Sequence, residues 1–519
     1  MLPPIPVRTP LPPARNPLQA LLPVTAALVL TVLVGCASTA APPASVSLDT
    51  PAQWQAPLPH QGSLGQLSEW WAQQGDPLLL ALIDAAQAAS PSIATARANI
   101  ERARATQASA RAELMPKLDA TGSVSRSQNG PANGAAAPVS LLQAGLQSSW
   151  EIDVFGYNRA VRDASNARLD GSQALRHDAR VSVAAETARQ YYALRTCARQ
   201  LTVSQADTRS RLETARLSAL ASQAGFEAPA TTALARASAA QSRAKSTQQQ
   251  ALCDLDVKAL VALTGLAEPQ LRDRLAASGE VAQQELIPVP VVASVPAQAL
   301  AQRPDVLNAA RLLAAASFDV VGSRAERYPR LSLSGAVTAA RIFGQGARQS
   351  YNTWSIGPLS LTLPLLDGGA SRAQVDAARA HYVEAATAYR NTARQAVREV
   401  EEALVNLQST ADQIGDAATA ADGYRASFAG TEARYKAGLA SLVELEDSRR
   451  TLLAAQSALV SLELERRRAW IALYRALGGG WTTDTPQAVP IAQAAPIAHA
   501  IPVVQATPIT RHQTSESYS

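Results

Sequence analysis

The chain repeats one pattern of landmarks at a constant offset of 213 residues. The matched pairs are Pro91 and Pro304, Pro116 and Pro329, and Gly225 and Gly438 (304 − 91, 329 − 116 and 438 − 225 all equal 213). The segments that lead to Pro116 and Pro329 also share the triplet Arg-Ala-Glu. Self-similarity at a fixed offset indicates a duplicated structural unit. We therefore expect two copies of one unit, with the same elements in the same order.

Each copy predicts a helix, a β-hairpin, a very long helix and a returning helix. The first helix ends just before a proline, where helices commonly end. Apolar and polar residues then alternate with a period of two around a turn-rich loop, which predicts two strands with one apolar face. The long helix contains no proline and ends at an Ala-Gly pair. The predicted ranges are helices 76–112 and 296–327, strand pairs at about 117–154 and 330–365, long helices 159–222 and 372–437, and returning helices 229–263 and 439–477.

The N-terminus has the pattern of a secretory leader. Arg8 and Arg15 precede an apolar run at about 18–34, which ends in Leu-Val-Gly-Cys at Cys36. This tetrapeptide resembles a bacterial lipobox, in which Cys36 would be lipidated on sulfur and become the mature N-terminus. The alternative is an uncleaved membrane helix with an incidental cysteine, because the run is nearly long enough to span a bilayer.

The repeat and the leader together predict the domain organisation. Net charge is +5 for the whole chain, falls to about +3 without the two leader arginines, and is spread without a basic block, so we expect no nucleic-acid partner. The predicted ranges are a signal peptide at 1–35, a lipid-anchored linker at 36–75, a first repeat at 76–265, a linker at 266–295, a second repeat at 296–480 and a disordered Pro/Ala-rich tail at 481–519.

One chain supplies only four membrane-type strands, although a closed barrel needs about eight. Open sheet edges in lipid leave backbone groups unpaired at several kcal/mol each. We therefore expect several chains to share one barrel. A helix of about 64 residues reaches on the order of 95 Å, far beyond the thickness of a membrane. A secreted lipoprotein with these parts is suited to bridging a periplasm, and its fold class is mixed α and transmembrane β-barrel.

Three strings and the duplicated element order resemble the outer membrane factors (TolC-like) of tripartite efflux systems. The strings are Arg303-Pro-Asp305, Tyr328-Pro-Arg-Leu-Ser332 and Tyr435-Lys-Ala-Gly438, and the resemblance covers about 70–480. The lipobox resembles that of the NodT-type lipoprotein subgroup. The resemblance implies a homotrimer with a 12-stranded barrel and a 12-helix periplasmic tunnel. It further implies location in the cell outer membrane, a periplasmic adaptor and an inner-membrane RND pump as partners, and no cofactor.

The segment after the second Ala-Gly turn, 442–450, begins a helix at the end farthest from the membrane. The resemblance implies that Asp447 and Val443 line a closed periplasmic aperture, with Glu444 beside them. The alternatives are a solvated charged face, or pairing of Glu446 with Arg450 four residues later within the helix. The first copy has Leu234 where the second has Asp447 (447 − 213 = 234), so the acidic gate would come from the second copy only.

No motif for catalysis or metal binding is found in the sequence. The five histidines form no H-E-x-x-H spacing, and neither G-x-x-x-x-G-K-[ST] nor G-x-S-x-G occurs. The glycines at 478–480 follow a long helix and predict a helix stop rather than a phosphate cradle. We therefore expect a protein that is not an enzyme and has neither metal nor cofactor.

Two cysteines lie at equal distances from the first Gly turn. Cys197 is 28 residues before Gly225 and Cys253 is 28 residues after it (225 − 197 and 253 − 225). Residues equidistant from the turn of two antiparallel helices sit at the same height, and the periplasm is oxidising. We expect a disulfide, provided that both residues face the partner helix. The alternative is two small buried thiols in the seam.

Two other lipoproteins would fit part of this pattern. A periplasmic adaptor would have one helical hairpin flanked by lipoyl-like β segments, and not a duplicated unit with strands. A purely structural coiled-coil lipoprotein would lack the period-two alternation of the strands. The exported compound is not encoded in a passive duct, so drugs, organic solvents and metal ions are all compatible with the sequence.

Overall fold

A computed structural model describes residues 41–46, 70–71, 75–128, 138–278, 300, 303–344 and 347–480. The predicted signal peptide at 1–35, Cys36, the tail at 481–519 and most of both linkers lie outside these residues. The elements of the first copy are α2 Pro77–Ala89, α3 Pro91–Ala112, β1 Lys117–Ser127, β2 Val139–Ile152, α4 Tyr157–Gln223, α5 Pro229–Thr264 and α6 Glu268–Ala277. The elements of the second are α9 Pro304–Ala325, β3 Arg330–Gly344, β4 Ala347–Thr362, α10 Ala370–Lys436, α11 Leu442–Ala476 and a 3₁₀ turn at Gly478–Gly480.

The first predicted helix, 76–112, is wrong as a single element. It is divided into α2 and α3, whose axes differ by 48°. The break lies at Ser90, whose extended backbone caps α3 while its Oγ accepts a hydrogen bond from the Ile93 N–H at 3.4 Å. Pro91 lacks an N–H and pushes the residue before it out of the helical region. The predicted linker at 266–295 also contains a helix, α6.

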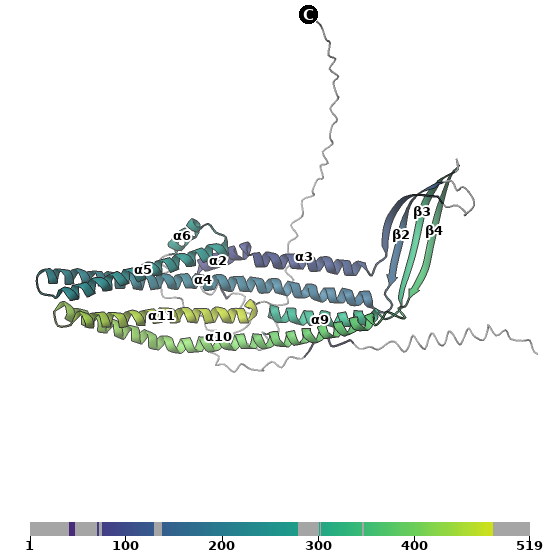
Figure 1. The fold of residues 1–519 in the computed structure, drawn as a ribbon. Helices are drawn as coiled ribbons and strands as arrows, with labels where there is room; N and C mark the ends of the chain where they lie inside the picture. The colour runs from purple at the N-terminus through teal and green to yellow at the C-terminus, as the bar shows by residue number, and fades with distance from the viewer. Residues whose placement is uncertain are drawn as a thin grey trace, which may run out of the picture. The chain divides into compact units, whose positions relative to one another are not determined.

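The four strands form one antiparallel sheet in the order β1-β2-β3-β4 (Figure 1). The central pairing joins the two copies, because β2 lies beside β3 in a register that sets Trp150 opposite Leu333. Large apolar side chains on the sheet are exposed, among them Leu118, Val124 and Val337. Within one chain β1 and β4 remain edges that carry unpaired backbone groups.

Both long helices end in the same backbone motif, which confirms the duplicated unit at atomic detail. Gly225 and Gly438 have φ values of +79° and +75°, in the left-handed region that glycine adopts readily. The N–H of Phe226 donates to the Ala221 carbonyl, and the N–H of Leu439 donates to the Arg434 carbonyl, both at 2.8 Å. This is the Schellman arrangement, which satisfies the last carbonyls of a helix and reverses the chain.

The largest apolar core lies where α2 and the ends of α5 and α11 meet the middle of the two long helices. Trp70 stacks on Trp470 with ring centroids 4.4 Å apart, and Trp71 contacts Tyr474 edge to face at 4.7 Å. Among the described helices, α9 is long and apolar enough to cross a membrane, and α2 and α3 pass the same test when taken together. α9 packs against α4 and α10, and side chains such as Leu313 and Val320 are fully buried.

Candidate functional site

Four helices of one chain lie side by side in the half of the helical part that is distant from the sheet. α5 packs on α4, α4 on α11, and α11 on α10 (Figure 1). Nearer the sheet, the neighbours of α4 are α3 and α9. There α9 packs on α4 in the position that α11 occupies in the half distant from the sheet. One chain therefore supplies a wall of four helices, with α5 at one side and α10 at the other. A wall of this kind encloses a space only when further copies complete it.

Arg303 joins the ends of α9 and α11 to α10. Its guanidinium donates to the Ala476 carbonyl at 3.0 Å, to Asp305 at 2.7 Å and to Glu399 at 2.9 Å. Burial alone would lower the pKa of Arg303, but the two carboxylates outweigh it and the pKa is raised. Asp178 is affected by the charges of the same cluster. Burial, and to a smaller extent repulsion from Asp305, raise the pKa of the Asp178 carboxyl.

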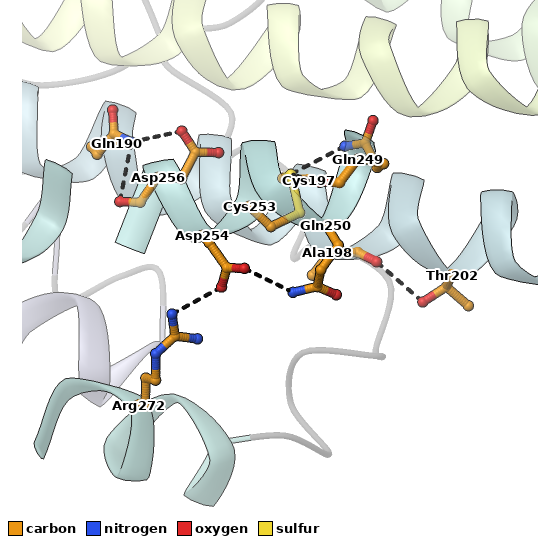
Figure 2. Close-up of a disulfide and its surroundings, with 10 residues drawn as sticks. All are labelled: Gln190, Cys197, Ala198, Thr202, Gln249, Gln250, Cys253, Asp254, Asp256 and Arg272. Carbon is orange, nitrogen blue, oxygen red and sulfur yellow. Dashed lines mark hydrogen bonds and ion pairs between the residues drawn. A yellow bond between two sulfur atoms is a disulfide. The ribbon is translucent and has the colours of Figure 1, made fainter. Parts of the chain in front are cut away.

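The structure joins the sulfur atoms of Cys197 and Cys253 across the first hairpin (Figure 2). Their Cα atoms are 5.5 Å apart, and both residues are buried. The Gln249 side-chain amide donates to the Cys197 sulfur at 3.1 Å. Gln190 and Asp256 bridge the same two helices at 2.9 Å. The two cysteines therefore have the equal height and the facing orientation that the sequence analysis required.

The second hairpin has no covalent link at the same height. Thr410 and Arg466 occupy the positions equivalent to the cysteines (410 − 197 and 466 − 253 both equal 213). The Thr410 hydroxyl donates to the Asn406 carbonyl of its own helix at 2.7 Å. The two hairpins of one chain thus differ in the strength of their internal connection.

The three predicted gate residues lie together at the start of α11, but they do different things there. Glu444 forms a capping box with Ser441: its backbone N–H donates to the Ser441 hydroxyl at 3.2 Å, and its carboxylate accepts from the Ser441 N–H at 3.0 Å. Val443 is 66% exposed. Asp447 is also exposed and forms an ion pair with Arg450 within α11. Asp447 and Val443 are thus both exposed on the surface of the chain.

The alternative pairing of Glu446 with Arg450 does not form. Glu446 instead faces the first hairpin, where Arg211 of α4 and the Ser238 hydroxyl of α5 donate to its carboxylate. Its partner within α11 is Arg449, three residues later, while Arg450 turns to Asp447. The helix repeat of 3.6 residues leaves both i+3 and i+4 positions nearby, and packing against α4 selects between them.

Arg449 and Asp207 complete this network, which was not predicted from the sequence. The Arg449 guanidinium donates to the Thr214 hydroxyl at 3.0 Å and to the Ser210 hydroxyl at 3.1 Å. Burial lowers the pKa of Arg449, although Glu446 opposes that shift. Asp207 accepts from Arg211 at 2.9 Å. The only hint in the sequence was the spacing of four residues between Asp207 and Arg211, which is common on helices that need no partner.

An open groove of about 730 Å³ lies among α4, α10 and α11. Charged pairs line it, including Glu186 with Arg189 at 2.7 Å and Glu402 with Arg398 at 3.5 Å. A lining with charges of both signs favours water and ions over an apolar ligand. Across the ranges that the structure describes, no group of three or more His, Cys, Asp and Glu side chains is arranged to hold a metal ion.

The model of the outer membrane efflux protein family matches residues 82–266 and 295–479, one match for each copy of the repeat. The pyoverdine export outer membrane protein OpmQ of Pseudomonas putida is 31% identical over 468 residues, which are 88% of this chain and 96% of that protein. The solvent efflux pump outer membrane protein SrpC of Pseudomonas putida is 28% identical over 415 residues, 78% of this chain and 86% of that protein.

Solved structures share the fold over most of its length. The outer-membrane channel OprN superposes with a TM-score of 0.73 at 26% identity, covering 86% of this chain and all of that one (100%). The outer membrane protein VceC of Vibrio cholerae superposes with a TM-score of 0.69 at 26% identity, covering 80% of this chain and 99% of that one. Because at least 80% of this chain is covered in each case, the shared fold extends into both copies of the repeat.

Proposed function

The chain belongs to the outer membrane efflux protein family, and we propose that three copies of it form the outer-membrane duct of a tripartite efflux system. The duct conducts compounds passively from a periplasmic adaptor and an inner-membrane RND pump to the exterior. It performs no catalysis. The observation that carries the proposal is the combination, in one chain, of a four-stranded sheet with exposed apolar side chains and a four-helix wall.

Assembly follows from the open sides of both parts. The edges of β1 and β4 can be satisfied in lipid only by strands of other copies. Four strands from each of three chains give twelve, which exceeds the minimum of about eight for a closed barrel. The unpartnered sides of α5 and α10 would meet neighbouring copies in the same way. The number three is taken from the resemblance to trimeric outer membrane factors.

Acylation of Cys36 adds an anchor in the outer membrane. A single acyl chain holds a protein only marginally, whereas two or more signals give stable anchoring. A diacylated sulfur together with the shared barrel satisfies that requirement. The N-terminal tether then places the helices in the periplasm, where an adaptor can reach their distal ends.

The duct test measures assembly and conduction in one preparation. Purified acylated protein should migrate as a trimer in unheated detergent gels and as a monomer after boiling, and it should produce discrete conductance steps in planar bilayers. A periplasmic adaptor or a coiled-coil lipoprotein would give no such steps. Monomeric migration without heating, together with electrically silent bilayers, would contradict the proposal.

We further propose that Asp447 and Val443 form the periplasmic gate. Both side chains are exposed at the start of α11, and threefold symmetry would bring three copies of each toward one axis. The network of Glu446, Arg211 and Arg449 would hold α11 against α4 of the same chain while the gate is closed. Glu444 caps the helix that carries the gate.

The cargo is set by the pump rather than by the duct. The relatives named above serve pyoverdine export and solvent efflux in their own systems. Those compounds differ in size and charge, which is what a passive conduit permits. Identification of the pump encoded beside this chain would therefore define the cargo better than any residue of the chain.

A further inference from the structure

The N-terminal segment at 41–46 is bound to the helices near the sheet by two side-chain hydroxyls. Ser317 of α9 donates to the Pro42 carbonyl at 2.6 Å, and Tyr382 of α10 donates to the Pro43 carbonyl at 2.9 Å. Ser317 is only 1% exposed, so its hydroxyl points into a covered site. We call these two hydroxyls the tether seat.

Other hydroxyls of the same two helices behave differently. Ser323 of α9 donates to the Asp319 carbonyl at 2.8 Å, and Thr387 of α10 donates to the Val383 carbonyl at 2.9 Å, four residues earlier in each case. This is the usual bond of a serine or threonine inside a helix. The bond from Ser317 runs instead to a residue 275 positions earlier in the chain. The seat is therefore a tertiary contact and not a by-product of helix geometry.

Two consecutive prolines suit the segment to this contact. Each proline ring fixes φ and removes the backbone N–H, which leaves the carbonyl as the only polar backbone group to satisfy. An ordered Pro-Pro step also loses less conformational entropy than two ordinary residues would. Ser317 and Tyr382 each supply the one donor that a proline carbonyl needs.

The position of the seat matches the length of the chain that leads to it. Pro42 lies six positions after Cys36 (42 − 36), and an extended chain spans at most about 20 Å over six positions. Ser317 lies eight residues before the end of α9 (325 − 317), which corresponds to about 12 Å along the helix. From the seat, Cys36 can therefore reach the end of α9, after which the chain turns toward β3.

We propose that Pro42 and Pro43 form a seated tether, which holds the acylated Cys36 at the boundary between the helices and the strands. The partner is the hydrocarbon of the membrane leaflet at that boundary, entered by the acyl chains beside α9 and α10. The inference rests on the proposed acylation of Cys36. The seat fixes the place at which the acyl chains enter the membrane.

A shortened tether tests the reach. Deletion of residues 39–41 retains Ala37 and Ser38 beside the acylated cysteine but places Pro42 only three positions after it, or about 10 Å of chain. That length is less than the distance of about 12 Å along α9 from Ser317 to the end of the helix. Pro42 therefore cannot bind Ser317 while the acyl chains on Cys36 are in the membrane. We expect a several-fold lower yield of heat-modifiable trimer. Deletion of residues 47–49, on the other side of the seat, is the matched control and should leave the yield unchanged.

Release of the seat should rescue the shortened protein. Ser317→Ala with Tyr382→Phe removes both donors while retaining both side-chain shapes, and it should restore the trimer yield of the 39–41 deletion. Ser323→Ala with Thr387→Val removes hydroxyls bonded within the same helices and should not restore it. A shortened protein that assembles like the wild type, or equal rescue by the control pair, would overturn the seated tether.

A second measurement uses the full-length acylated protein and does not depend on assembly of variants. A nitroxide attached at Ser45→Cys, which is exposed, should show restricted motion that becomes free in the Ser317→Ala, Tyr382→Phe background. Free motion in both backgrounds would also overturn the inference. Incorporation of a fatty-acid analogue is scored in parallel. Unlabelled wild-type protein contradicts the acylation itself, whereas labelled protein with a mobile tether contradicts only the seat.

Discussion

Arg211 of α4 donates a hydrogen bond to the carboxylate of Glu446 of α11, and this contact ties the two hairpins of one chain together near their distal ends. Arg449 binds the same carboxylate from within α11 and is almost fully buried. The negative charge of Glu446 thus lies beside the positive charges of two arginines in a largely buried site. Asp207 supplies the second negative charge beside Arg211.

Glu446→Gln should loosen the contact between the hairpins. Removal of one charge leaves two covered guanidinium groups undercompensated, and such a loss costs roughly 1–3 kcal/mol. We expect a lower denaturant midpoint and more frequent open-channel events in bilayers. Asp422→Asn, which removes an exposed pair with Arg425 on α10, is the control and should change neither quantity. If Glu446→Gln and Asp422→Asn had the same denaturant midpoint and the same frequency of open-channel events, the proposed role of Glu446 would be contradicted.

Asp447→Ala should open the periplasmic end. With the exposed carboxylate removed, we expect higher single-channel conductance and greater sensitivity of cells to large antibiotics such as vancomycin. Val443→Ala should add to the effect, so the double variant should exceed either single one. If Asp447 instead faces the adaptor, efflux would fall while conductance stayed at the wild-type value. Asp412→Ala, at another exposed site on α10, serves as the control.

Cys36→Ser should abolish lipid attachment. Cells that express the wild type and are grown with a fatty-acid analogue should yield a labelled protein, because a thioether-linked diacylglycerol forms only on cysteine. The serine variant should stay unlabelled and retain the leader. Absence of label from the wild type in a host that acylates other lipoproteins would exclude the anchor.

The duplicated order of elements was predictable because its signals are local. Prolines, Ala-Gly pairs and period-two alternation act within a few residues, and the constant offset between Gly225 and Gly438 reinforced each of them. The bend at Ser90 was missed for a related reason. A proline at position 91 is compatible both with the start of a new helix and with a bend between two helices. The sequence does not distinguish these two cases, because the direction of α2 depends on its tertiary packing.

The partners of Glu446 were not predictable from the chain. Its contact with Arg211 joins positions 235 residues apart and depends on how α11 is rotated against α4. The seat of Pro42 on Ser317 joins positions even farther apart. By contrast, the cysteine pair was predictable because both residues belong to one hairpin, in which the turn at Gly225 fixes their height.

His177 should make the protein less stable in mild acid. Burial, reinforced by Arg180, lowers the pKa of this histidine to about 4 from an ordinary value of 6.5. Between those values the unfolded chain binds a proton that the folded chain excludes, so the free energy of unfolding falls as the pH drops from about 6.5 to 4. The loss is on the order of 3 kcal/mol, at 1.36 kcal/mol for each pKa unit.

His177→Gln should flatten this dependence, measured as the denaturant midpoint at pH 7 and pH 5. His381→Gln provides the control, because His381 lies exposed on α10 beside Glu384. The control variant should retain the wild-type slope. An unchanged slope in His177→Gln would show that another group causes the acid sensitivity.

The bond between Cys197 and Cys253 should make the first hairpin the rigid one of the pair. It closes a loop with a sequence separation of 56 residues, and chain entropy alone assigns such a loop about 4 kcal/mol of stabilisation. The second hairpin, which carries Asp447, has Thr410 and Arg466 at the equivalent positions, so only non-covalent contacts hold its two helices together at that height. Cys197→Ser with Cys253→Ser should therefore lower the denaturant midpoint while leaving gate conductance close to that of the wild type.

Thiol counting under denaturing, non-reducing conditions tests the bond directly. If Cys36 is acylated on its sulfur as proposed, absence of free thiols in the mature chain supports the bond, whereas two free thiols for each chain would rule it out. The double serine variant separates stiffness from gating. If it conducted like Asp447→Ala, the first hairpin would take part in opening, and the assignment of movement to the second hairpin alone would be wrong.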